Sequence, residues 1–93
     1  AIDWIEALGD YARIHAGRRA HLVAQRMHVL EHALGGGPFL RVHRSAIVNV
    51  QRIRELLREA DGGGMLVLED GLRLRVARGR WGALQEALAM REV

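Results

Sequence analysis

The 93-residue sequence contains no cysteine, which excludes disulfide bonds, a Cys-ligated zinc or iron–sulfur site and thiol catalysis. No apolar run reaches the roughly 18 residues that a membrane-spanning helix needs, and the first residues lack the layout of a signal peptide. The reducing cytoplasm suits such a chain, and we expect the protein to act there without contacting a membrane. The chain does not begin with Met, so we also expect another domain to precede it in the natural protein.

The remaining composition is that of one small globular domain. Hydrophobic residues make up 49% of the chain and charged residues 27%. A chain of this length can bury one modest core but not two. We therefore interpret residues 1–93 as a single domain of a longer protein.

Lysine is absent as well. All 14 basic residues are arginine, and with 11 acidic residues the formal net charge is +3. A basic surface attracts polyanions, and planar guanidinium groups bind phosphate or a guanine edge with two hydrogen bonds. Coding bias in a GC-rich genome also replaces lysine by arginine, so the positions of the arginines must decide between the two explanations.

The first half of the chain predicts three strands and one helix. The first strand precedes the turn at Leu8–Asp10, and the second covers residues 11–15. The third covers residues 20–23, after a turn at Gly17–Arg18. Met27, Leu30 and Leu34 then recur at i, i+3 and i+7, which predicts an amphipathic helix that ends at Gly35.

The second half predicts further strands and a terminal helix. The strands cover residues 39–43, 46–50, 53–58, 65–68 and 72–76, with a helix as the alternative over 53–58. The polar pair Arg44–Ser45 separates the first two of these strands, and Asp70–Gly71 forms the two-residue tip of the last hairpin. Trp81, Leu84 and Leu88 again follow helical spacing.

Alternation within these strands predicts which side chains face the core. Ile53, Glu55 and Leu57 share one face of their strand, and Leu72, Leu74 and Val76 point inward in theirs. The expected fold is mostly β with helices (α+β), built of small antiparallel sheets with one internal helix and a short C-terminal helix.

Two groups of residues could support other chemistry. His28 and His32 stand four residues apart on the predicted helix and could share a metal ion, but no third ligand accompanies them, so we favour exposed helix histidines. A small metal sensor is the alternative. His43 and Ser45 resemble part of a hydrolase triad, yet no glycine elbow surrounds the serine. We expect no catalysis, no metal and no cofactor.

The arginines are better placed for function. Arg41 and Arg44 flank a strand break, and Arg78 and Arg80 lie between the last strand and the last helix. If both junctions open on one edge of the sheet, their guanidinium groups form a row suited to a nucleic-acid backbone. The alternative is that any arginine-rich surface places arginines in its loops.

The segment Phe39–Val50 reads FLRVHRSAIVNV and is followed by Ile53, by the Glu69–Gly71 turn and by Val76–Arg78. In this order the motifs resemble the LytTR family of bacterial DNA-binding domains. The Gly9–Tyr11 segment and the first helix also lie where that family has theirs, so the resemblance covers almost the whole chain.

The resemblance implies the output domain of a bacterial transcriptional regulator, such as a two-component response regulator, that binds specific double-stranded DNA sequences with loops in the major groove. Arg44 and Arg78 match positions that contact bases, and Arg80 belongs to the same junction as Arg78. Arg41, His43 and Ser45 match positions suited to backbone phosphates. The first hairpin, with Asp10, Tyr11 and Arg13, is expected to reach another groove, and Asn49 to satisfy buried backbone groups.

Repeated half-sites on the DNA would allow the protein to bind as a homodimer. The alternative is a protein-interaction or dimerisation module that has lost DNA binding. Two positions depart from the family's pattern: Ala77 stands where serine is common, and Asp10 where asparagine is frequent. An acid near phosphates is unfavourable unless it pairs with Arg13 or accepts from a cytosine amino group.

Overall fold

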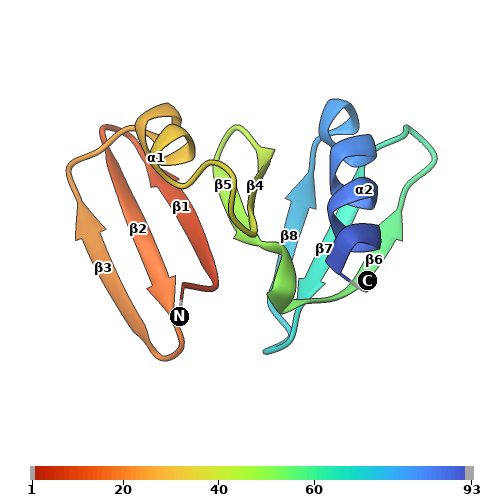
Figure 1. The fold of residues 1–93 in the computed structure, drawn as a ribbon, viewed down its shortest axis with the longest axis horizontal. Helices are drawn as coiled ribbons and strands as arrows, with labels where there is room; N and C mark the ends of the chain where they lie inside the picture. Colours follow the sequence, from red (N-terminus) through yellow and green to blue (C-terminus); the bar gives the residue numbers. More distant parts are fainter. Residues whose placement is uncertain (1, 92–93) are drawn as a thin grey trace.

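The computed structural model describes residues 2–91, which form two antiparallel sheets and two α-helices (Figure 1). Along the chain the elements are β1 (Trp4–Leu8), β2 (Tyr11–Ala16), β3 (Arg19–Val23), α1 (Met27–Ala33), β4 (Phe39–His43), β5 (Ala46–Asn49), the 3-10 turn η1 (Val50–Arg52), β6 (Ile53–Arg58), β7 (Gly64–Leu68), β8 (Arg73–Val76), the 3-10 turn η2 (Arg78–Arg80) and α2 (Trp81–Arg91). The predicted fold class is confirmed. The helix alternative over residues 53–58 is wrong, because this segment is β6.

The first sheet has the strand order β3-β2-β1-β5-β4 and is covered on one face by α1 (Figure 1). Ile5 and Ala12 face the helix from neighbouring strands, together with Ile47 of β5, and Met27 is the buried residue of α1. Leu30 and Leu34 are half-buried against this small core. The helical stripe predicted from the sequence therefore packs as expected.

The second sheet, β6-β7-β8, forms the larger core with α2 and with the inner side of β4 and β5. Its fully buried members include Val48 of β5, Leu66 of β7 and Leu84 of α2. Leu84 and Trp81 are buried and Leu88 is half-buried, as the helical spacing predicted. The chain therefore buries two cores and not the single one that its length predicted. Strand β5 contributes Ile47 to the small core and Val48 to the large one, which fixes the loops of both sheets relative to each other.

A β-bulge corrects the predicted faces of β6. The register with β7 shifts between Ile53 and Glu55, so strict alternation is interrupted. Ile53 is buried and Leu56 is half-buried in the core, whereas Leu57 is exposed. The extra residue of a bulge moves every later side chain to the opposite face, which the sequence pattern does not reveal.

The β7–β8 hairpin also differs from the prediction at its tip. Leu68 and Leu72 pair across a three-residue loop, and Gly71 N–H donates to the Leu68 carbonyl at 2.9 Å. Gly71 alone in this loop has positive φ, at 92°, so Asp70 is not left-handed. A type I turn followed by a left-handed glycine is a common hairpin loop. The strand then begins at Arg73, which leaves Leu72 exposed instead of inward-facing.

Among residues 2–91, no helix is both long and apolar enough to span a membrane. Asn49 is buried, as expected of a residue that satisfies backbone groups. Its Nδ2 donates to the Ile2 carbonyl at 2.9 Å, and its Oδ1 accepts from Gln51 N–H at 3.0 Å, which caps η1.

Candidate nucleic-acid interface

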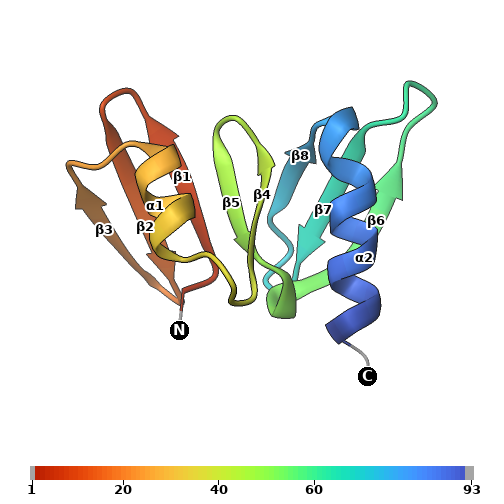
Figure 2. The same ribbon diagram turned by 45° about the horizontal axis from the view of Figure 1, so that its top comes forward.

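Four connections of the chain lie side by side at one edge of the molecule (Figure 2). We call this the loop edge; it comprises the Gly9–Asp10 turn, the Arg44–Ser45 turn, the loop at residues 59–63 and the segment Ala77–Arg80. The strands β1, β4, β6 and β8 all run toward it. It follows the longest axis of the molecule, which extends over 34 Å.

Long-range contacts join the neighbouring parts of the loop edge. Ala7 N–H, beside the first turn, donates to the Ser45 carbonyl at 2.9 Å, and Ala77 N–H donates to the Val42 carbonyl at 2.8 Å. The second bond links the two arginine-bearing junctions directly, so they open on the same edge. The sequence predicted a row of guanidinium groups if both junctions open on one edge, and the structure meets this condition.

The aliphatic part of the Arg78 side chain packs against the protein, whereas its guanidinium group has no ion-pair partner among residues 2–91. A Cβ atom at Gly62 would lie only 2.9 Å from Cδ of Arg78, so the glycine makes room for the aliphatic part of this side chain. Arg44, Arg78 and Arg80 are exposed, and among residues 2–91 none of their side chains has an ion-pair partner. Unpaired guanidinium groups on rigid junctions can bind an anion without first breaking a salt bridge.

Arg41 is engaged within the molecule. Its Nη2 donates to the Arg44 carbonyl at 2.6 Å and its Nε to the His43 carbonyl at 3.4 Å, while Nη1 pairs with Glu31 of α1 at 3.4 Å. The side chain is only 17% exposed. Arg41 thus braces the Arg44–Ser45 turn and ties it to α1, a role that the sequence did not indicate.

His43 and Ser45 also stabilise this turn. Nδ1 of His43 lies 2.8 Å from Ser45 Oγ and accepts from Ser45 N–H at 3.2 Å. Because a backbone N–H can only donate, Nδ1 is the acceptor and a neutral His43 carries its proton on Nε2. The side chains of His43 and Ser45 do meet at the strand break. No carboxylate among residues 2–91 pairs with His43, so the third member of a hydrolase triad is missing there.

The first hairpin contributes side chains of mixed charge. Asp10 pairs with Arg26, with Oδ1 and Nη2 2.9 Å apart, and not with Arg13 as one alternative proposed. Arg13 lies 3.7 Å from Glu6, which also accepts from His15 at 3.0 Å. Tyr11 is 49% exposed at the start of β2. The sequence pattern does not indicate Arg26, because a lone arginine before a helix carries no recognisable signal.

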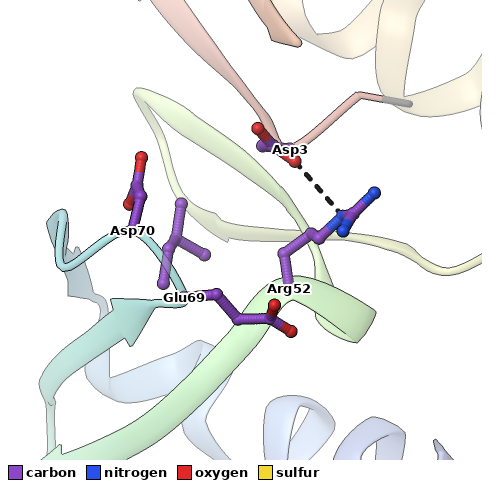
Figure 3. A pocket seen from close by; sticks show the side chains of 5 residues that line it. Asp3, Arg52, Glu69 and Asp70 are labelled. Carbon is purple, nitrogen blue, oxygen red and sulfur yellow. Dashed lines mark ion pairs between the residues drawn. The ribbon is translucent and has the colours of Figure 1, made fainter. Parts of the chain in front are cut away.

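The opposite edge of the molecule has a different electrostatic character (Figure 3). A pocket of about 140 Å³ there is lined by Asp3, Arg52, Glu69 and Asp70. Arg52 Nε lies 3.2 Å from Asp3 Oδ1, so these two charges offset each other. The carboxylates of Glu69 and Asp70 then make the net charge of the pocket negative. Such a surface repels a phosphate backbone, so it does not extend the loop edge.

The two helix histidines do not form a metal site with other residues. His28 and His32 are exposed on α1. No group of three or more His, Asp or Glu side chains between residues 2 and 91 is close enough to hold a metal ion.

Comparison with known proteins shows that this fold is that of a class of DNA-binding domain. The LytTr DNA-binding domain family matches residues 1–89. The chain belongs to the LytTR family, which confirms the resemblance found in its sequence.

Two relatives illustrate the match. The CO-responsive transcriptional regulator RcoM of Rhodospirillum rubrum is 36% identical over 77 residues, which are 83% of this chain. The matched part is 32% of RcoM, so the chain spans about a third of that regulator. The solved LytTr DNA-binding domain of a putative methyl-accepting/DNA response regulator from Bacillus cereus shares the fold, with a TM-score of 0.83, 23% identity, and coverage of 94% of this chain and 80% of that one.

Proposed function

We propose that this domain binds double-stranded DNA sequence-specifically, as the output domain of a cytoplasmic transcriptional regulator, and that the loop edge enters the major groove. The observation that carries the proposal is the row of exposed arginines without ion pairs at Arg44, Arg78 and Arg80. Membership in the LytTR family supports the choice of DNA over other polyanions.

In this proposal Arg44 and Arg78 read bases, because hydrogen bonds hold the junction of each in place, from the Arg41 side chain to the Arg44 carbonyl and from Ala77 N–H to the Val42 carbonyl. A guanidinium group aimed in this way can donate to both O6 and N7 of a guanine. Arg80, His43 and Ser45 contact phosphates beside them. Arg41 is a positioning residue that shapes the turn of Arg44.

The first hairpin reaches a second groove with Tyr11 and Arg13, while Asp10 orients Arg26 toward the backbone. The dimensions support this arrangement. The whole molecule extends 34 Å along the axis that the loop edge follows, and successive major grooves are one helical turn, about 34 Å, apart. A single domain can therefore contact two adjacent grooves from one side of the duplex.

The test begins with selection of bound sequences from a random duplex pool, followed by titrations at several salt concentrations. Each phosphate contact releases counterions, so the logarithm of affinity should fall with that of salt by about 0.9 per contact. Arg78→Ala and Arg44→Ala should each weaken discrimination at one base pair. Arg73→Ala is the matched control, because Arg73 is exposed at the start of β8, away from the loop edge. Salt-independent binding, or no binding to any selected duplex, would reject the proposal.

We further propose that this chain is one domain of a longer regulator and that it binds repeated half-sites as a homodimer. The domain itself would catalyse no reaction and hold no cofactor. The alternative, an interaction or dimerisation module without DNA binding, draws on the exposed Tyr11 and Leu22 on one face of the first sheet. Sedimentation with and without the selected duplex separates these cases, because the alternative predicts self-association that DNA does not affect.

A further inference from the structure

A hollow of about 220 Å³ opens on the loop edge between the first turn and the Arg44–Ser45 turn. Ala7 and Gly9 form one wall, Arg26 and His28 at the start of α1 form a second, and Arg41 with Arg44 forms the third. Three segments that are distant in the sequence therefore meet around one concave site. Neither Arg26 nor His28 was among the DNA contacts expected from the sequence.

The lining of the hollow is positively charged. Three arginines and one histidine line it, and the carboxylates of Asp10 and Glu31 are already paired, with Arg26 and Arg41 respectively. Arg44 has no ion-pair partner among residues 2–91. Arg26 uses only Nη2 for Asp10, and a guanidinium group has five N–H donors, so donors remain for a second anion.

The size of the hollow limits what it can hold. Sites for whole small molecules usually measure about 300 Å³ or more, and this one is smaller and open to solvent. A single charged group on a larger molecule fits these dimensions better than a complete nucleotide.

We propose that the hollow binds one phosphate of the DNA backbone, with Arg26 and His28 as donors and with the positive charge of Arg44 at its rim. This inference rests on the proposed function and adds a further segment, the start of α1, to the four connections of the loop edge. Asp10 holds Arg26 over the hollow, which explains how an acidic residue is accommodated so near the phosphates.

The two histidines of α1 provide a matched pair for the test. His28 lines the hollow, whereas His32 stands one turn further along the helix and does not. Titrated against the selected duplex, His28→Ala should weaken binding roughly fivefold, the value of one ordinary hydrogen bond, and His32→Ala should leave it unchanged. Arg26→Ala should weaken all single-base variants equally and lower the salt slope by about one. Thermal melting checks that each variant folds.

A neutral methylphosphonate scanned along the duplex identifies the phosphate itself. One position should weaken the wild type but have little further effect on His28→Ala or Arg26→Ala. If the wild type binds while His28→Ala behaves like His32→Ala, or if no such position exists, the hollow is not a phosphate site and the proposed function stands. If Arg26→Ala changes the ranking of base variants, the hollow contacts a base and the inference is wrong. Failure of the wild type to bind any duplex rejects both proposals.

Discussion

The two edges reached by the same strands differ in how they use several of their arginines. At the loop edge, Arg44 and Arg78 project from braced junctions and have no ion-pair partner among residues 2–91. At the opposite edge, Arg52 pairs with Asp3, and Arg91 donates to the Val50 and Ile53 carbonyls at 2.6 and 2.8 Å. Arginine composition alone therefore does not mark a binding surface. What marks it is the gathering of arginines on junctions that long-range hydrogen bonds hold at one edge. Arg73 also has no ion-pair partner among residues 2–91, but it lies away from that edge.

Arg41 complicates this contrast, because it lies near the loop edge but behaves like the arginines of the opposite edge. Its three donor groups are all engaged within the molecule. The comparison therefore predicts three classes of arginine: those that contact DNA, one that positions them, and those that stabilise the fold. The following substitutions separate these classes, from the largest expected effect to the smallest.

Arg78→Ala should cost about 1–3 kcal/mol of discrimination at one base pair, since a bidentate contact with guanine is lost. Arg44→Ala should do the same at a different base pair. Titration of both variants against single-base variants of the selected duplex measures the effect. If Arg78→Ala weakens all sequences equally and keeps their ranking, Arg78 is a phosphate anchor and its assignment as a base reader is wrong.

Arg41→Ala should lower the free energy of unfolding by about 1–2 kcal/mol, because charged hydrogen bonds to two carbonyls are removed. The variant should also change the order of preference among bases at the pair that Arg44 contacts, because Arg41 stabilises the turn that carries Arg44. Arg41→Lys distinguishes this role from phosphate binding: lysine keeps the charge but cannot reproduce the fork. If Arg41→Lys binds DNA like the wild type and Arg41→Ala only lowers the salt slope, Arg41 is a phosphate contact as the sequence first indicated.

Ala77→Ser should raise the free energy of unfolding by about 1 kcal/mol. Ala77 occupies the N-cap of η2 with extended backbone and provides no side-chain cap. A serine hydroxyl can accept from a free N–H of the first turn, whereas Ala77→Val cannot and serves as the control. Chemical denaturation compares the three proteins. Equal midpoints for serine and valine would show that the first turn needs no cap.

Arg52→Ala should change stability least, by about 0.5 kcal/mol, since its pair with Asp3 is partly exposed to solvent. Binding to DNA should be unaffected, apart from a small long-range loss of positive charge that disappears at higher salt. The measurement is a denaturation curve together with a titration at two salt concentrations. Loss of sequence discrimination in this variant would erase the contrast between the two edges.

Most of the secondary structure could be predicted because it depends on neighbouring residues. Glycine-containing turns and the spacing of Met27, Leu30 and Leu34 specify local conformation, and the structure agrees at α1. The prediction was wrong where pairing with another strand decides the outcome. The bulge in β6 exposes Leu57, and the three-residue loop at Glu69–Gly71 exposes Leu72.

The sequence by itself also determined the family, because the motif around Arg44 and the later Val76–Arg78 segment occur in a specific order. Only the tertiary structure decided what each arginine can do. A hydrogen bond between Ala77 and Val42 brings Arg78 beside Arg44, and packing of α1 on the sheet brings His28 to the same hollow as Arg44. These contacts join residues far apart in the chain. Their geometry follows from how the whole core packs, which no local pattern encodes.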